Sequence, residues 1–107
     1  MKFSALYGTS KLTSSSNTLL YTSPSAAGAS AQVRVNVVNT HASSTAKFYL
    51  MQGGSTKDTN SITGEITLAA GESAIKSDIV LKNNDTLYIK CDTANVLTVS
   101  VWGVEHP

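Results

Sequence analysis

The residue types that could carry out catalysis are few in this 107-residue chain and lie far apart. It has two histidines, His41 and His106, and neither has a Cys, Asp or Glu beside it at the spacing of a metal site. His41 falls in a turn-forming segment and His106 lies next to the last residue, so neither is held in place as the base of a nucleophilic triad must be. We therefore predict neither a metal site nor a hydrolase.

The carboxylates fall mostly where turns and strand ends are expected, and there Asp and Glu commonly hydrogen-bond to nearby backbone amides. A glycosidase-type pair would need two of them to converge across a cleft, which the sequence neither requires nor excludes. Gly53-Gly54 is not a phosphate loop, because no Lys-Ser/Thr ending and no helical segment follow it. We expect no catalytic residues, no cofactor and no enzymatic activity. The carboxylates are Asp58, Glu65, Glu72, Asp78, Asp85, Asp92 and Glu105.

Composition restricts the partners of the chain. Eight basic and seven acidic residues give a net charge of +1, which supplies no basic surface for nucleic acid and no polybasic segment for a membrane. Hydrophobic residues make up 41% against 14% charged, so residues 1–107 are expected to form a single globular domain with an unusually neutral surface. The first residues contain no long apolar run, and we expect neither a signal peptide nor a membrane span.

Strict alternation of apolar and polar residues is the main structural signal. Residues 85–105 predict two alternating strands joined by a tight turn, with Cys91 on an apolar face as a small buried hydrophobe rather than a reactive thiol. Residues 32–39 form the cleanest strand, with Val33, Val35 and Val37 on one face, and residues 45–52 are predicted to pair with them as a hairpin.

Four further strands are expected, and no helical periodicity is visible. They cover residues 1–12, 18–22, 62–68 and 73–81, and the first of them is expected at a sheet edge. Residues 53–61 contain no apolar side chain, and we expect them to form the most mobile loop of the chain. Lys57 and Asp58 are expected to be exposed in this loop and to contribute little to stability. The predicted fold is all-β: a single antiparallel β-sandwich or jelly-roll-like domain of seven to eight short strands.

Aromatic residues on the nominally polar faces of these strands are the candidates for a binding surface. Interfaces are enriched in Tyr and Trp, so a subunit or partner contact is the favoured interpretation. The alternative is a carbohydrate-binding module in which Tyr49, Tyr88 and Trp102 stack on sugar rings. The candidate contact residues are Phe3, Tyr7, Tyr49, Tyr88 and Trp102.

Several segments together resemble a family of small virion structural proteins of tailed bacteriophages. The matching positions are 18–25 (Thr-Leu-Leu-Tyr-Thr-Ser-Pro-Ser), 33–39, 52–55, 68–73 (Leu-Ala-Ala-Gly-Glu-Ser), 84–87 (Asn-Asp-Thr-Leu) and 101–105 (Val-Trp-Gly-Val-Glu). The resemblance implies a non-enzymatic capsid decoration or cement protein, or else a tail, baseplate or fibre component. It also implies a location in the virion after synthesis in the host cytoplasm, a homo-oligomer with a trimer favoured, and the major capsid protein or tail proteins as partners.

Overall fold

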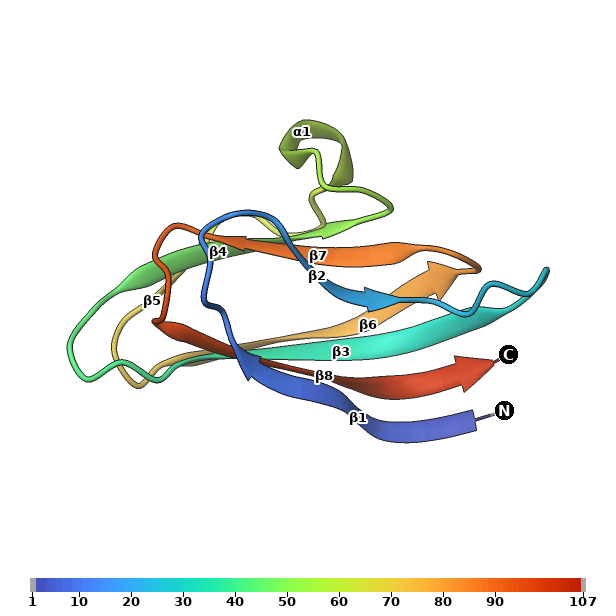
Figure 1. The fold of residues 1–107 in the computed structure, drawn as a ribbon, viewed down its shortest axis with the longest axis horizontal. Coiled ribbons are helices and arrows are strands. Elements are labelled where there is room, and N and C mark those ends of the chain that lie inside the picture. The colour runs from blue at the N-terminus through green and yellow to red at the C-terminus, as the bar shows by residue number, and fades with distance from the viewer. Residues whose placement is uncertain (1, 107) are drawn as a thin grey trace.

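Within the described residues, eight strands form two antiparallel four-stranded sheets that pack face to face (Figure 1). The structure is a computed structural model that describes residues 2–106, and it describes side chains from residue 10 to residue 106. One short helix, α1 (Lys57–Asn60), follows the fourth strand. The strands are β1 (Lys2–Lys11), β2 (Thr18–Thr22), β3 (Ser30–Asn39), β4 (Ala46–Gln52), β5 (Ile66–Leu68), β6 (Ser73–Lys82), β7 (Thr86–Cys91) and β8 (Leu97–His106).

The order of the strands defines a jelly roll. The first sheet has the order β1-β8-β3-β6 and the second the order β2-β7-β4-β5. Strand one therefore pairs with strand eight, two with seven, three with six and four with five, as in one long hairpin rolled into a sandwich. The predicted all-β sandwich is confirmed, and β1 lies at a sheet edge as expected.

Two predicted pairings are wrong. Strand β3 does not form a hairpin with β4, because β3 pairs with β6 and β8 while β4 pairs with β5 and β7 in the other sheet. Likewise the turn at residues 92–96 does not close a hairpin but carries the chain from β7 in one sheet to β8 in the other. Alternation shows which face of a strand is buried, and that pattern is the same whether the next strand lies beside it or across the core.

The alternating residues fill the space between the sheets as predicted. Val33, Val35 and Val37 of β3 are all buried, and Val35 is 0% exposed. Phe48 and Leu50 of β4 belong to the same buried cluster. Burial of such side chains stabilises the fold by about 1.5–3 kcal/mol each, so this layer is the main favourable contribution to folding. The strands β7 and β8 contribute Leu87, Ile89, Cys91, Leu97, Val99 and Val101 to it.

Residues 53–65 cover the outer side of β4 and are not the unpacked loop that the sequence predicts. Met51, on the side of β4 opposite Phe48 and Leu50, is 0% exposed and forms an isolated bridge with Ser61. The side chain of Asn60 fixes the segment: its Nδ2 donates to the Gln52 carbonyl at 3.1 Å, and its Oδ1 accepts from the Thr56 amide at 3.0 Å. The helix α1 was not predicted, because four residues are too few to show a helical period.

Val35→Asp should unfold the domain. The substitution places an unpaired carboxylate in the centre of the core, at a cost of several kcal/mol, which is on the order of the whole stability of a small domain. Thermal denaturation followed by circular dichroism measures the effect. Leu19→Asp, at a half-exposed position of β2, is the matched control and should shift the melting temperature by only a few degrees. A Val35→Asp protein that melts close to the wild type would show that this core assignment is wrong.

Asn60→Ala should be the most harmful alanine substitution in residues 53–61, with a loss of about 1–3 kcal/mol, because it removes the hydrogen bonds to the Gln52 carbonyl and from the Thr56 amide, each worth about 0.5–1.5 kcal/mol. Asp58→Ala, at an exposed position, should stay within about 0.5 kcal/mol of the wild type. Lys57→Ala should lose only slightly more, since the Lys57 ammonium lies 5.3 Å from the centre of the Tyr49 ring. Urea denaturation of the three variants compares them directly, and equal midpoints would contradict the assigned role of Asn60.

Candidate functional site

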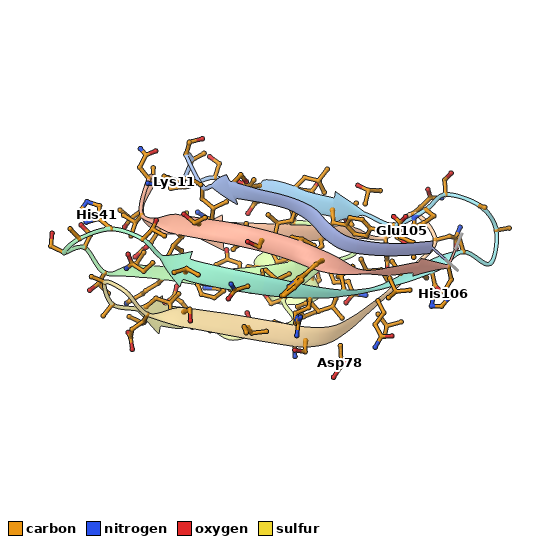
Figure 2. The ribbon with its side chains drawn as sticks, turned by 90° about the horizontal axis from the view of Figure 1, so that it is seen from below. Lys11, His41, Asp78, Glu105 and His106 are labelled. Carbon is orange, nitrogen blue, oxygen red and sulfur yellow. The ribbon has the colours of Figure 1, made fainter. Side chains whose placement is uncertain are left out.

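A groove of about 500 Å³ opens on the outer face of the first sheet, between β8, β3 and β6. Figure 2 views this face, with the four strands β1, β8, β3 and β6 in front. The groove combines one aromatic ring, one cation, one anion, an amide and a hydroxyl. Its lining residues are Gln32, Val33, Arg34, Ser77, Asp78, Trp102, Gly103 and Val104.

A β-bulge in β6 forms one wall of the groove. Val33 pairs with Ile79 and Val35 pairs with Lys76, so two residues of β6, Ser77 and Asp78, lie opposite one residue of β3. A bulge bends its strand and redirects the side chains there. Asp78 has a φ of 58°, a left-handed conformation that Asp tolerates better than most residues. Figure 2 shows Asp78 at the edge of the sheet, and the Gln32 amide donates a hydrogen bond to its Oδ1 at 3.4 Å.

Arg34 and Trp102 form the opposite wall. They are register partners on β3 and β8, and the Arg34 guanidinium carbon lies 4.1 Å from the centre of the Trp102 ring. This distance is typical of a cation–π contact, which orients the guanidinium and covers one face of the indole. The indole Nε1 is buried and has no hydrogen-bond partner. The face of the ring that Arg34 covers is therefore not free for stacking on another planar group.

Gly103 allows β8 to approach β3 closely at the floor of the groove. A Cβ atom at this position would lie 2.1 Å from the Gln32 carbonyl oxygen and 2.8 Å from the Val33 Cα. Both atoms belong to the backbone and cannot move aside without breaking the ladder. A side chain at residue 103 is thus excluded, and the floor of the groove stays flat.

The groove can bind through hydrogen bonds and charge but has no arrangement for nucleophilic catalysis. Asp78 is the one carboxylate that lines it, and no histidine does. His41 Nδ1 accepts hydrogen bonds from the amides of Ser43 at 3.1 Å and Ser44 at 3.0 Å, so it stabilises a turn. Figure 2 places His41 and His106 at opposite ends of the sheet. Among residues whose side chains are described, no group of three His, Cys, Asp or Glu could hold a metal ion.

The structure does not bring the predicted aromatic residues together. Trp102 lies on the outer face of the first sheet, whereas Tyr49 and Tyr88 belong to β4 and β7 of the second sheet. Tyr49 is 9% exposed, so its predicted role as an open stacking platform is wrong, and Tyr88 is half-buried. Phe3 and Tyr7 lie on β1 at positions whose side chains are outside the described residues.

Arg34, Asp78 and Gln32 are site residues that the sequence did not single out. Each belongs to a strand with a regular alternating pattern, so Arg34 and Gln32 are ordinary solvent-facing positions in sequence terms. The bulge at Asp78 depends on the pairing of β6 with Val33 and Val35 of β3, which are distant along the chain, and local sequence holds no signal for it.

Cys91 is buried as predicted. Its Sγ lies 3.3 Å from the Ser14 carbonyl and 3.4 Å from the Thr93 carbonyl, and the thiol donates to them. Burial raises the pKa of the Cys91 thiol above its ordinary value, and the nearby Asp92 carboxylate raises it further. The thiolate is therefore disfavoured, as in structural rather than reactive cysteines.

No helix in residues 2–106 has the length and apolar character that a bilayer crossing requires.

No family model matches the sequence, and no curated protein matches it. Among solved structures, a similarity is found to the structure of Eiger TNF from S. frugiperda, with 14% sequence identity and a TM-score of 0.30. The alignment covers 76% of this chain and 61% of that chain, so this chain spans less than two thirds of that protein's length. A similarity at this level carries no inference about function.

Cys91 should resist modification by a thiol reagent such as Ellman's reagent in the native protein at pH 8. The attacking species is the thiolate, and the raised pKa together with burial keeps it scarce and inaccessible. Because the raised pKa belongs to the folded state, the same shift should lower the free energy of unfolding as the pH rises above the ordinary thiol pKa. Denaturation in guanidinium should restore full reactivity. Rapid labelling of the native protein would contradict this assignment.

Proposed function

We propose that this protein is a non-enzymatic structural protein of a bacteriophage virion, most simply a capsid decoration or cement protein that binds the capsid surface as an oligomer, with a trimer favoured. The observation that carries the proposal is a jelly-roll domain that presents large apolar side chains on a sheet face. Ile75 is 59% exposed and Val80 is 62% exposed. The jelly roll is a recurrent fold of viral capsid domains.

The absence of reactive groups in the groove and the resemblance to small phage virion proteins support the same role. A protein that acts by covering another surface needs a contact surface of fixed shape. In this fold the strands of the sheet supply such a surface. The partner of a decoration protein is the major capsid protein. The alternative within this class is a tail, baseplate or fibre component, which would have tail proteins as partners and could use the same fold.

A carbohydrate-binding module is the second candidate, and the groove at Trp102 is the observation that favours it. Arg34, Asp78 and Gln32 are side chains that commonly hydrogen-bond to sugar hydroxyls. The contact between Arg34 and Trp102 weighs against stacking, because it covers one face of the indole. A glycan array together with titration of the Trp102 fluorescence tests this candidate, and binding abolished by Arg34→Ala would favour it over the virion role.

Virions purified from a producing culture should contain this protein. A decoration protein should occur at a copy number comparable to that of the major capsid protein, whereas a tail or fibre part should occur in far fewer copies. Quantitative mass spectrometry of density-purified particles measures the ratio, and electron microscopy with a specific antibody locates the protein. Absence from purified particles would reject both virion roles.

A further inference from the structure

The outer face of the first sheet carries more positive than negative charge (Figure 2). On each strand alternate residues fill the core, so the residues between them and their register partners point outward. Among the outward residues whose side chains are described, Lys11, Arg34 and Lys82 are cations and Asp78 is the only carboxylate. The others are uncharged at pH 7. This face therefore attracts acidic groups more than basic ones.

Arg34 lies near the centre of this face and has no acceptor for its hydrogen bonds. In the part of the chain with described side chains, its guanidinium stacks on Trp102 but forms no ion pair and no hydrogen bond. Asp78 lines the same groove, yet its carboxylate accepts from the Gln32 amide at 3.4 Å and is not paired with Arg34. A guanidinium carries five N–H donors. Because Arg34 is exposed, these donors are available to a ligand.

The contact with Trp102 orients the guanidinium before anything binds. A planar guanidinium stacked on an indole keeps its edge free, and a carboxylate can accept two parallel hydrogen bonds from that edge. Ordering a mobile arginine on binding costs free energy, and here the cation–π contact has already restricted Arg34. The floor beside the pair is flat, because a Cβ atom at Gly103 would lie 2.1 Å from the Gln32 carbonyl oxygen. The groove thus presents an oriented pair of donors.

The surroundings of Arg34 favour a protein as the source of the anion. Ile75, 59% exposed, and Val80, 62% exposed, lie on either side of the bulge that forms one wall of the groove. Large apolar side chains gain free energy from burial against another protein, but not from contact with a hydrated small anion. Tryptophan, tyrosine and arginine are also enriched among the residues that dominate binding at protein interfaces. The anion that an unmodified protein surface offers is the carboxylate of an aspartate or glutamate.

We infer that the groove is a binding site for an acidic side chain of the protein partner, whose carboxylate accepts two hydrogen bonds from Arg34. The inference rests on the proposed function and adds the chemistry of the contact. The partner presents the carboxylate on a segment whose own apolar residues cover Ile75 and Val80. Lys82 and Lys11 lie toward opposite ends of the same face, since their register partners are Ser30 at the start of β3 and Thr98 near the start of β8. They attract the acidic segment toward the groove.

The direct test needs no identified partner. Hexaglutamate is titrated into the protein at low ionic strength, and the fluorescence of Trp102, the sole tryptophan, reports the occupancy of Arg34 beside it. A saturable change is expected with hexaglutamate and none with hexaglutamine. Arg34→Gln should weaken the binding at least about tenfold, because it removes the charge and the paired donors. A chemical-shift titration by NMR measures the affinity of any variant whose fluorescence changes too little.

Two control variants separate the groove from the general charge of the protein. Lys47→Gln removes one positive charge at an exposed position of β4, in the second sheet, and should bind the peptide as the wild type does. Asp78→Asn keeps a residue type that tolerates the left-handed φ of 58° and removes a repelling charge. It should bind at least as tightly as the wild type. Circular dichroism establishes that each variant is folded.

Several outcomes would overturn the inference. They are the absence of a saturable change in the wild type, unchanged binding by Arg34→Gln, and loss of binding by Lys47→Gln. Loss of binding by Asp78→Asn would also overturn it, because the ligand would then be held by the Asp78 carboxylate, as a sugar would be. Inorganic phosphate, titrated alone, should bind more weakly than hexaglutamate, and tighter binding would assign the groove to a phosphate group instead.

Rebinding to virions distinguishes failure of this inference from failure of the virion role. Particles from which the protein has been removed are incubated with the wild type and with Arg34→Gln. Equal rebinding of the two proteins would overturn the inference and leave the virion role in place. Binding of hexaglutamate through Arg34, by a protein that is absent from purified particles, would support the binding site and reject the virion role.

Discussion

Burial of alternate side chains between the two sheets is the interaction on which the rest of the structure depends. Each long strand gives its inward residues to one shared layer, and the layer forms only when strands from both sheets are present. Val35 is completely buried because β4 and β7 lie across from it, and those strands are held in turn by the valines of β3. The cooperativity of a small domain follows from this mutual dependence. The core uses one side of each strand, and the outer side of β4 is covered as well, by residues 53–65.

The alternation of side chains is a local property of the sequence and the pairing of strands is not. The strands were therefore predicted well and their pairing partners poorly. The segment 18–22 begins and ends where β2 does, and Ser73–Lys82 differs from its prediction by one residue, because alternation and turn residues are local. Pairing is not local: in a jelly roll β3 joins β8, which lies about 65 residues further along the chain, and the following strand β4 goes to the other sheet. The predicted strand 62–68 shrank to Ile66–Leu68, since the residues before it meet β4 only through an isolated bridge between Met51 and Ser61 and one hydrogen bond from the Ile62 amide to the Leu50 carbonyl.

The candidate site was less predictable than the fold, for a physical reason. The sequence singled out Trp102 by its residue type alone. The residues beside Trp102 in the structure are determined by the register between strands, which the sequence did not reveal. Arg34 lies on Trp102 because the two are cross-strand partners, and Asp78 reaches the groove because a bulge inserts one residue. Tyr49 fails as a platform because residues 53–65 cover that side of β4, although they have few apolar residues. Asn60 holds them by hydrogen bonds to the backbone, and a pattern of apolar residues cannot reveal such contacts.

The edge of β6 indicates which kind of association this fold permits. A ten-residue edge strand with exposed Ile75 and Val80 would invite strand addition from another chain, which proteins prevent with charges, bulges or cover. All three are present: Lys76 and Lys82 are exposed on the edge strand, the bulge at Asp78 interrupts its ladder, and Gln52 Nε2 donates to the Val80 carbonyl at 2.8 Å. These features protect the edge of β6 against strand addition. Addition along a strand edge can repeat from copy to copy without limit, so a protected edge disfavours open-ended assembly of this fold.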